Sequence, residues 1–250
     1  MVEAPVAIVT GGSRGIGAAT VLKLAELGYS VCINWLTDSA AAHSVLDEAS
    51  RRGSLAIAVQ ADVSVEDDVL RLFRAVDEQL GQLKVMVNSA GIVLPQTRVE
   101  AMDAARIERI LRTNVVGAFL CAREAIKRMS TRRGGSGGAV VNVSSAASRT
   151  GSPNEYVDYA ASKGAIDTLT KGLSLEVADE GIRVNCVRPG FIDTDMHASS
   201  GEPGRVDRLK CSIPLKRGGT AEEVAEAICW LASDRASYCT GTFIDCAGGR

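Results

Sequence analysis

Short apolar runs rich in β-branched residues alternate along the chain with longer segments in which apolar residues recur at helical spacing. The seven runs are residues 6–10, 29–34, 55–60, 84–88, 139–144, 183–188 and 242–246. Strands separated by helices in this way pack as a parallel sheet, because right-handed crossovers place the helices on its faces. The pattern therefore predicts an α/β fold, with one doubly wound, seven-stranded parallel sheet and helices on both faces.

The spacing of these runs stays regular as far as Arg188. It predicts one domain over residues 1–250 with no linker, and a first helix from Gly15 to Leu27. Residues 189–219 break the pattern, because they contain three prolines and five glycines and have no clear period. We expect this segment to form a mobile substrate loop.

Composition and charge narrow the class of protein. Apolar residues make up 46% and aromatic residues 4%, which suits a parallel sheet of Val, Ile, Leu and Ala buried between helices. A net charge of −2 argues against a nucleic-acid partner. The seven cysteines contain no CxxC pair, so we expect reduced thiols and no metal site. The N-terminal segment resembles neither a signal peptide nor a membrane span, which predicts a cytoplasmic protein.

Four motifs follow predicted strands and should meet at one edge, because the carboxyl ends of parallel strands form the ligand-binding edge of such a sheet. These are TGGSRGIG (10–17), NSAG (88–91), SSAAS (144–148) and PGFIDT (189–194). A fifth glycine-rich segment, RRGGSGG (132–138), follows a helix and lacks the GK[ST] ending of a phosphate-binding loop. We expect it to be a solvated, flexible connection.

The first glycine-rich turn is a candidate site for a dinucleotide. It lies between a strand and a helix, where the absence of side chains lets a pyrophosphate approach the positive end of the helix. Its spacing, Gly11-xxx-Gly15-x-Gly17, differs from the GxGxxG fingerprint. A purely structural turn is the alternative reading of these glycines.

The end of the second strand bears on the choice of cofactor. NAD-binding folds place an acidic residue there for the ribose 2′-hydroxyl, but this strand ends in Asn34-Trp35. Since no carboxylate would repel a 2′-phosphate and Arg14 supplies positive charge, NADP is favoured over NAD. In the alternative, Arg14 is a solvated residue and Asp38 folds back to bind NAD.

Two tyrosines precede a lysine in YVDYAASK, the start of a predicted helix. Tyr159 and Lys163 are four residues apart and share a helix face, whereas Tyr156 lies about 10 Å from the lysine along the axis. An ammonium group near a phenol favours the phenolate, so we expect Lys163 and an oxidised nicotinamide to lower the pKa of Tyr159. The null hypothesis for YxxxK alone is two surface residues.

The motifs taken together resemble the short-chain dehydrogenase/reductase family over nearly the whole chain. The matching segments are TGGSRGIG, Asp62-Val63, NSAG, Asn114, Ser144-Ser145, YAASK (159–163) and PGFIDT. The resemblance implies a Rossmann fold, an NAD(P)-dependent oxidoreductase, a homotetramer or dimer, and an Asn-Ser-Tyr-Lys tetrad. It implies hydride transfer between nicotinamide C4 and a carbonyl or secondary alcohol substrate.

Residue roles follow from the resemblance. Tyr159 would act as general acid in reduction and as base in oxidation, while Lys163 binds the nicotinamide ribose. Ser145 would hydrogen-bond the substrate oxygen, with Ser144 as a structural neighbour and Ser148 as a weaker candidate for the same role.

Asn114 falls inside a predicted helix over residues 103–130. The resemblance implies that it holds a water molecule, through which protons pass toward Lys163.

The resemblance also assigns residues to the cofactor. The second asparagine of the family's NNAG motif is replaced by Ser89 in this chain. The residues assigned to the cofactor are Gly11, Ser13, Arg14, Gly15, Ile16, Gly17, Asn34, Asp62, Val63, Asn88, Ala90, Gly91, Tyr159, Lys163, Pro189, Gly190, Ile192 and Thr194.

Two other function classes stay open. A non-redox relative, such as a dehydratase or epimerase, usually carries a large substrate domain after about residue 190, for which this chain has no room. A catalytically silent cofactor-binding scaffold or sensor tends to lose the tyrosine or the lysine, and both are present here.

The sequence leaves the substrate open. Residues 197–217 carry His197, Arg205, Arg208 and Lys210, which would suit an anionic carrier such as an acyl thioester. The segment would equally suit a lid over a sugar, or form a solvated basic loop. Similar family members include 3-oxoacyl-carrier-protein reductases and glucose-type dehydrogenases, and nothing in the sequence separates them.

Overall fold

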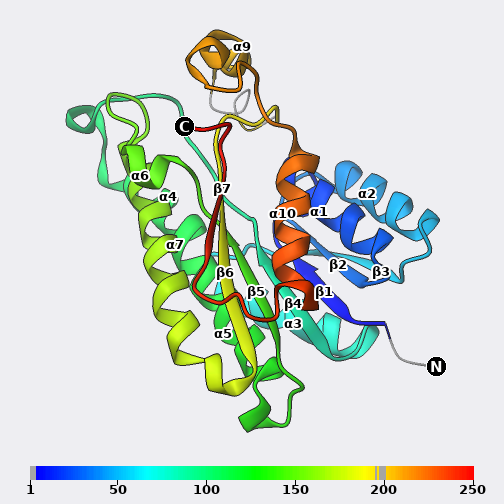
Figure 1. Cartoon of the computed structure of the whole chain (residues 1–250). Coiled ribbons are helices and arrows are strands. Elements are labelled where there is room, and N and C mark those ends of the chain that lie inside the picture. Colours follow the sequence, from blue (N-terminus) through cyan, green and yellow to red (C-terminus); the bar gives the residue numbers. More distant parts are fainter. Residues whose placement is uncertain (1–3, 195, 197–200) are drawn as a thin grey trace.

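The computed structural model describes residues 4–194, 196 and 201–250. Seven parallel strands form one sheet in the order β3-β2-β1-β4-β5-β6-β7 (Figure 1). The strands are β1 (Val6–Val9), β2 (Ser30–Trp35), β3 (Ala56–Gln60), β4 (Leu83–Asn88), β5 (Gly138–Val143), β6 (Ile182–Pro189) and β7 (Phe243–Cys246). Each lies within a residue or two of a predicted run, which confirms the doubly wound parallel sheet.

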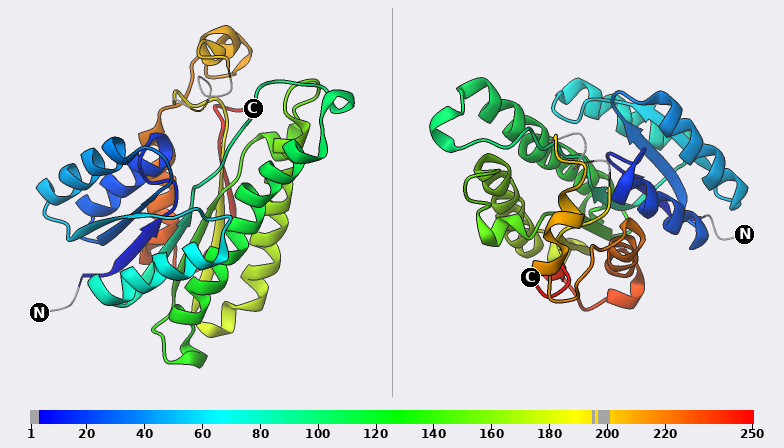
Figure 2. Two further views of the ribbon diagram at one scale, coloured as in Figure 1. Left: turned by 180° about the vertical axis from the view of Figure 1, so that it is seen from behind. Right: turned by 90° about the horizontal axis from the view of Figure 1, so that it is seen from above.

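Helices cover both faces of this sheet (Figure 2). The main helices are α1 (Gly15–Glu26), α2 (Ser39–Arg51), α3 (Glu66–Gln79), α4 (Ala104–Leu111), α5 (Gly117–Met129), α7 (Val157–Glu176) and α10 (Ala221–Ala232). Side chains of β1 alternate between two cores: Val6 and Ile8 pack with α3, α5 and α7, while Ala7 and Val9 pack with α1 and α10. Because both faces are buried, the strands read as continuous apolar runs.

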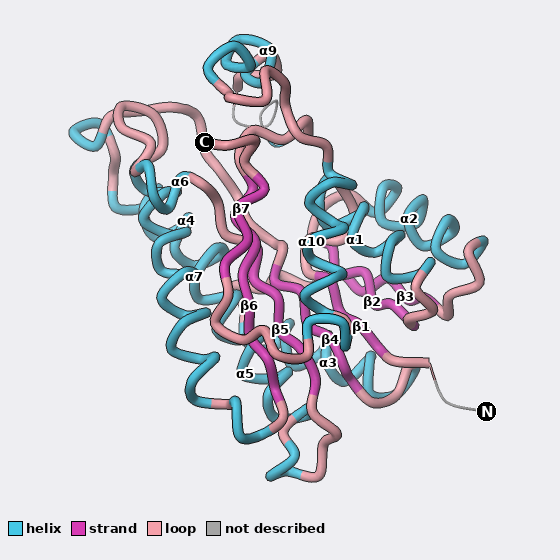
Figure 3. Tube along the Cα trace, viewed as in Figure 1, coloured by secondary structure: helices cyan, strands magenta, loops and turns pink. Residues whose placement is uncertain are grey.

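The strand order reverses direction between β1 and β4, which the tube in Figure 3 shows in the middle of the sheet. From β1 the chain winds outward to β2 and β3, and then returns to build β4 to β7 on the other side. In open α/β sheets, ligands bind at the carboxyl ends of the strands at such a reversal. The fold therefore places a crevice beside the turns that follow β1 and β4.

The prediction of a single helix over residues 103–130 is wrong in one respect. The chain forms α4, then a π-helical turn over Arg112–Val116, then α5. Such a turn inserts an extra residue into a helix and is frequent at functional sites. Here it contains Asn114, whose side chain is buried and hydrogen-bonded to the backbone of Ile92. A tertiary contact therefore stabilises the irregular turn.

The described parts of residues 189–219 contain more regular structure than the loop expected from the sequence. They contain α9 (Arg205–Leu209), and a β-bridge joins Ile192 to Gly219. Val206 and Ile213 are buried, so apolar contacts hold the segment to the rest of the chain. His197, expected to contribute positive charge here, lies outside the described residues.

The segment 132–138 is also more constrained than the flexible connection expected from its composition. A Cβ on Gly135 would lie 2.4 Å from the carbonyl oxygen of Arg128, and a Cβ on Gly137 would lie 2.5 Å from that of Gly181. Gly137 also has a positive φ of 72°. Close backbone packing therefore explains these glycines, at the edge of the sheet opposite the crevice.

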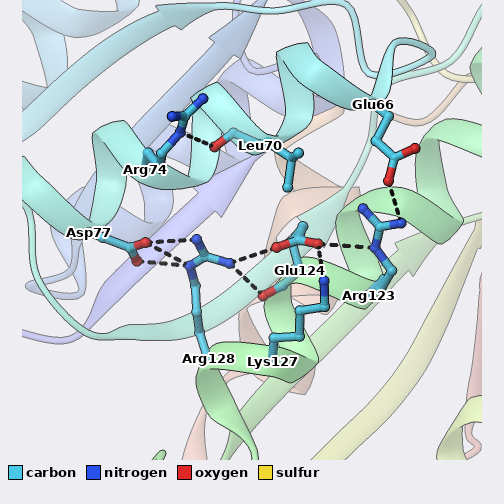
Figure 4. Close-up of polar contacts among 8 residues, drawn as sticks. All are labelled: Glu66, Leu70, Arg74, Asp77, Arg123, Glu124, Lys127 and Arg128. Atoms are coloured by element: carbon cyan, nitrogen blue, oxygen red, sulfur yellow. Dashed lines mark hydrogen bonds and ion pairs between the residues drawn. The ribbon is translucent and has the colours of Figure 1, made fainter.

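A network of ion pairs joins α3 to α5 on the outside of the molecule (Figure 4). Glu124, almost fully buried, accepts hydrogen bonds from Arg123, Lys127 and Arg128. Burial alone would raise the pKa of Glu124, but the hydrogen bonds from Lys127 and Arg128 outweigh it and lower the pKa. Arg128 also binds Asp77 on α3, so the buried carboxylate is compensated and the two helices are tied together.

Three further findings concern the described part of the chain. Its helices include none that is long and apolar enough to span a membrane. Its His, Cys, Asp and Glu side chains form no group of three or more that could hold a metal ion. All seven cysteines are free thiols, and Cys32, Cys121, Cys186 and Cys229 are buried.

Candidate active site

One cavity of about 740 Å³ lies at the carboxyl edge of the sheet. The right-hand view in Figure 2 looks down on this edge. Residues from all four strand-following motifs line the cavity, among them Gly15, Gly91, Ser145 and Thr194. The prediction that these motifs converge on one edge is confirmed.

The glycine-rich turn after β1 is held by backbone contacts that exclude side chains. A Cβ on Gly17 would lie 2.1 Å from the carbonyl oxygen of Gly11, so even alanine does not fit there. Gly11 and Gly15 have positive φ values of 63° and 51°. Both line the cavity with Ser13, Ile16 and Gly17, which leaves open backbone at the start of α1.

The end of β2 carries polar groups that are already engaged within the protein. Asn34 lines the cavity, but its amide donates to the carbonyl oxygen of Ala61 at 2.9 Å and so braces β2 against the chain after β3. The carboxylate of Asp38 accepts from the backbone N–H of Ala41 at 2.9 Å and caps α2. Arg14 is exposed and lines the cavity, whereas Asp38 does not.

The turns after β3 and β4 form the floor beside the glycine-rich turn. Asp62, Val63, Ala90 and Gly91, which were assigned to the cofactor from the sequence, line the cavity. Asn88 is absent from its lining.

The Asn88 side chain points into the core instead, where its amide donates to Asn142 at 2.9 Å. Asn142 in turn donates to Thr170 on α7 at 2.9 Å. This buried polar chain links β4, β5 and α7. Asn88 therefore supports the site from below, without touching the cavity.

Tyr159 and Lys163 both line the cavity from the first turns of α7. The Lys163 Nζ atom lies 5.6 Å from the centroid of the Tyr159 ring and donates to the carbonyl oxygen of Val143 at 2.8 Å. Tyr156 is the residue before this helix, and it also lines the cavity. The spacing argument correctly places Tyr159 beside the lysine.

Ser144 and Ser145 both line the cavity, but the hydroxyl groups of Ser144 and Ser148 donate to backbone oxygens. A hydrogen bond joins Ser145 to the Tyr159 side chain. Ser144 is buried and donates to the carbonyl oxygen of Lys163 at 3.1 Å. Ser148 donates to the backbone oxygen of Ser145 at 2.8 Å and is absent from the cavity lining.

The pKa values of the tyrosine and the lysine differ from the expected pattern. Burial raises the pKa of Tyr159 to about 12, and the hydrogen bond with Ser145 opposes this shift only in part. Burial also lowers the pKa of Lys163 to about 8. The lowering of the Tyr159 pKa by Lys163 that helical spacing predicted is thus not found, because desolvation of the phenol dominates and only the hydrogen bond with Ser145 opposes it.

Asn114 lies behind the cavity wall. Its Oδ1 accepts from the backbone N–H of Ile92 at 2.8 Å, and its Nδ2 donates to the backbone oxygen of Ile92 and to Ser162 at 3.0 Å each. Ser162 donates to the carbonyl oxygen of Tyr159 at 2.7 Å. A Cβ on Gly91 would lie 3.4 Å from both Asn114 Oδ1 and Lys163 Nζ, so the asparagine is a close neighbour of the lysine.

The segment after β6 closes the cavity from the other side. Pro189, Gly190, Ile192 and Thr194 all line it. A Cβ on Gly190 would lie 2.8 Å from the Cα atom of Ala247, which explains the glycine at that turn. The Thr194 side chain packs near Gly15, so the segment reaches across to the glycine-rich turn.

Comparison with known proteins agrees with this geometry. A family model described as enoyl-(acyl carrier protein) reductase matches residues 11–250. The chain is 62% identical over 245 residues to an uncharacterized oxidoreductase, YgfF, of Escherichia coli K12, covering 98% of this chain and 99% of that protein. It is 37% identical over 243 residues to the 3-oxoacyl-[acyl-carrier-protein] reductase FabG of Staphylococcus aureus Mu50, covering 97% and 96%.

The chain belongs to the short-chain dehydrogenase/reductase family. This short-chain dehydrogenase/reductase is an oxidoreductase that acts on the carbonyl/CH–OH pair with a nicotinamide cofactor. The 3-oxoacyl-[acyl-carrier-protein] reductase of Synechocystis, 38% identical over 248 residues, covers 98% of this chain and 96% of its own length.

Two residues that organise the site of this short-chain dehydrogenase/reductase were missed in the sequence. Thr10 accepts hydrogen bonds from the backbone N–H groups of Ser89 and Ala90, at 3.1 Å each, and so joins the turns after β1 and β4. Ser162 bridges Asn114 to the backbone of Tyr159. A polar residue at the end of an apolar strand was the available signal for Thr10, whereas no local signal marks Ser162.

Proposed function

We propose that the chain is an NADPH-preferring reductase that converts a ketone or aldehyde to an alcohol, with Tyr159 as general acid. Ser145, Lys163 and Asn114 complete the machinery, and residues 1–250 act as one catalytic unit. The observation that carries the proposal is the placement of Ser145, Tyr159 and Lys163 on the wall of the same cavity that the glycine-rich turn lines.

The cavity wall suits a dinucleotide. Gly11, Gly15 and Gly17 leave backbone exposed at the start of α1, where a pyrophosphate is stabilised by N–H groups and the helix dipole. Preference for a 2′-phosphate is supported by two features. Arg14 lines the cavity, and Asp38, the acidic residue that follows β2, is occupied as a helix cap. The cofactor, when bound, supplies the hydride.

Proton transfer then depends on groups of this chain. A phenol with a pKa of about 12 is protonated at neutral pH, so Tyr159 holds the proton that the reduced carbonyl oxygen needs. The Ser145 hydroxyl hydrogen-bonds the same oxygen. When Tyr159 gives up its proton, the buried phenolate is stabilised by the Lys163 ammonium group nearby. Asn114 positions the turn at Ile92 and, through a bound water, passes protons toward the lysine.

Assembly and location are part of the proposal. Leu111, Val116 and Phe119 on the α4–α5 side and Leu175 on α7 are exposed apolar side chains. Such residues support burial of these helices between copies of the chain in a homotetramer or dimer, in the cytoplasm. Light scattering of the purified protein tests the assembly.

The function is tested by incubating the protein with a panel of ketones and aldehydes and either NADPH or NADH. We expect alcohol to form in a one-to-one ratio with oxidised cofactor, faster with NADPH at limiting concentrations. Chromatography of the products measures the alcohol directly. Absence of alcohol from every carbonyl compound, by a protein shown to bind NADPH, would contradict the proposal.

A further inference from the structure

The part of the cavity beyond Tyr159 has a distinct set of charges. Its walls come from α4, the segment before α7, the segment after β6, α9 and the last residue of the chain. Arg109, Arg205 and Arg250 line this part from three separate elements. Among the described lining residues only Asp62 and Glu155 have acidic side chains, and Asp62 follows β3 beside the glycine-rich turn.

Arg205 is compensated and acts as a structural group. It is 5% exposed, and its guanidinium forms hydrogen-bonded ion pairs with both Glu155 and Glu202. The guanidinium also lies 5.0 Å from the centroid of the Tyr156 ring. This arginine and Glu155 neutralise one another, and they fix α9 against the segment that precedes α7. The alternative of a solvated basic loop is therefore wrong for Arg205, which is buried and paired.

The Arg250 guanidinium forms no ion pair with an acidic side chain among the described residues. Its guanidinium lies 4.8 Å from the centroid of the Phe191 ring, and among the described residues its hydrogen-bond partner is the Ser212 hydroxyl, at a long 3.4 Å. Arg149 donates to the main-chain oxygen of Arg250 at 2.9 Å and anchors the residue. Stacking on an aromatic ring pre-organises a guanidinium but leaves its N–H donors available in the ring plane.

Arg109 also lacks an acidic partner among the described residues. It lies on α4, one turn after Arg106, whose ion pair with Asp158 fixes this helix to the start of α7. Its side chain reaches the cavity from the wall that also contributes Thr113. Two guanidinium groups without an acidic side-chain partner among the described residues thus line the same cavity from two separate elements.

We propose that the substrate is a small ketone carrying a carboxylate, whose charge is met by Arg109 and Arg250 while its carbonyl reaches Tyr159. The inference rests on the proposed function and names the substrate class for that site. Guanidinium groups match the planar geometry of a carboxylate. An unpaired positive pair in a cleft also concentrates anionic substrates. A neutral sugar would gain nothing from either arginine.

The test compares oxo acids of several chain lengths with their methyl esters, using NADPH and the full-length protein. We expect the best acid to exceed its ester in kcat/KM by about tenfold or more, since a hydrogen bond to a charged group is worth about 1.5–3 kcal/mol. Added salt should raise KM for the acid and leave KM for the ester unchanged.

Arg109→Gln and Arg250→Gln should each reduce kcat/KM for the acid about tenfold and leave the ester within about twofold. Arg112→Gln is the matched control, because Arg112 is exposed on the same helical segment and does not line the cavity. Equal use of acid and ester, with a ratio that neither variant changes, would overturn this inference and leave the reductase function standing. Failure to reduce either compound in any pair, with NADPH bound, would contradict both.

Discussion

Arg106 and Asp158 form an ion pair that joins α4 to the start of α7, with Nε and Oδ2 2.7 Å apart. The Asp158 side chain is 2% exposed, and its other oxygen accepts from the backbone N–H of Tyr159 at 2.9 Å. The pair therefore fixes the first turn of the helix that carries the proposed acid.

Removing one partner of this pair should destabilise the protein. Arg106→Met leaves a buried carboxylate unpaired, so we expect the free energy of unfolding to fall by about 3 kcal/mol. The double variant Arg106→Met/Asp158→Asn should recover most of that loss, because the amide oxygen still accepts from Tyr159. Urea unfolding measures both. A loss below about 1 kcal/mol in the single variant would show that the pair is not effectively buried.

The two tyrosines of the cavity should respond differently to loss of a hydroxyl. Tyr159→Phe removes the proposed general acid, and we expect kcat to fall by about 10²–10⁴-fold. Tyr156→Phe keeps the ring beside Arg205, so kcat should stay within a few-fold of the wild type. Steady-state kinetics with NADPH and the best ketone measure kcat for both variants. Fluorescence measures NADPH binding in each variant. Equal kcat values for the two variants would show that Tyr159 is not the general acid.

We expect the buried charge of Lys163 to lower the free energy of unfolding of the protein when no cofactor is added. Burial lowers its pKa from 10.5 to about 8, so at pH 7 the folded state carries a desolvated charge that is more favourable in the unfolded chain. We expect Lys163→Met to raise the free energy of unfolding by roughly 3 kcal/mol at pH 7.

The pH dependence of that difference follows from the same shift. Between pH 8 and 10.5 the folded wild type has lost the Lys163 proton while the unfolded chain retains it, so wild-type stability rises with pH relative to the variant. Denaturant unfolding at pH 7, 8, 9 and 10 should therefore show the advantage of Lys163→Met shrinking. A difference that stays constant or grows over this range would mean that the lysine is not desolvated.

Arg14 should set the preference between cofactors. Replacing it by Gln removes the charge proposed for the 2′-phosphate, and we expect KM for NADPH to rise about tenfold while KM for NADH stays within about twofold. Arg133→Gln, an exposed arginine at the opposite edge of the sheet, is the control. If the Arg14 variant weakened the binding of NADPH and NADH equally, the arginine would contact a group that both cofactors share.

The strands and the meeting of the four motifs were predictable because both depend on local pattern and topology. Seven apolar runs marked the strands, and the carboxyl-edge rule brought the motifs together. The π-helical turn at Arg112–Val116 was not predictable, since it depends on hydrogen bonds between Asn114 and the distant backbone of Ile92.

Electrostatic details needed the packed structure for a similar reason. Helical spacing placed Lys163 near Tyr159, but it contained no information on burial, which sets the direction of both pKa shifts. Composition likewise marked Arg205 as a basic loop residue, while its ion pairs to Glu155 and Glu202 come from folding of α9 onto the cavity.

The position of Arg250 on the cavity wall has a practical consequence for anyone producing the protein. Arg250 lines the cavity at the carboxyl edge of the sheet, whereas the chain enters β1 at the opposite edge. Figure 1 shows β1 and the C-terminal end well apart. An affinity tag appended after Arg250 would project beside the pocket and disturb the anchoring by Arg149. A tag ahead of β1, removable by protease, leaves the pocket untouched and is the better choice for assays and crystallisation.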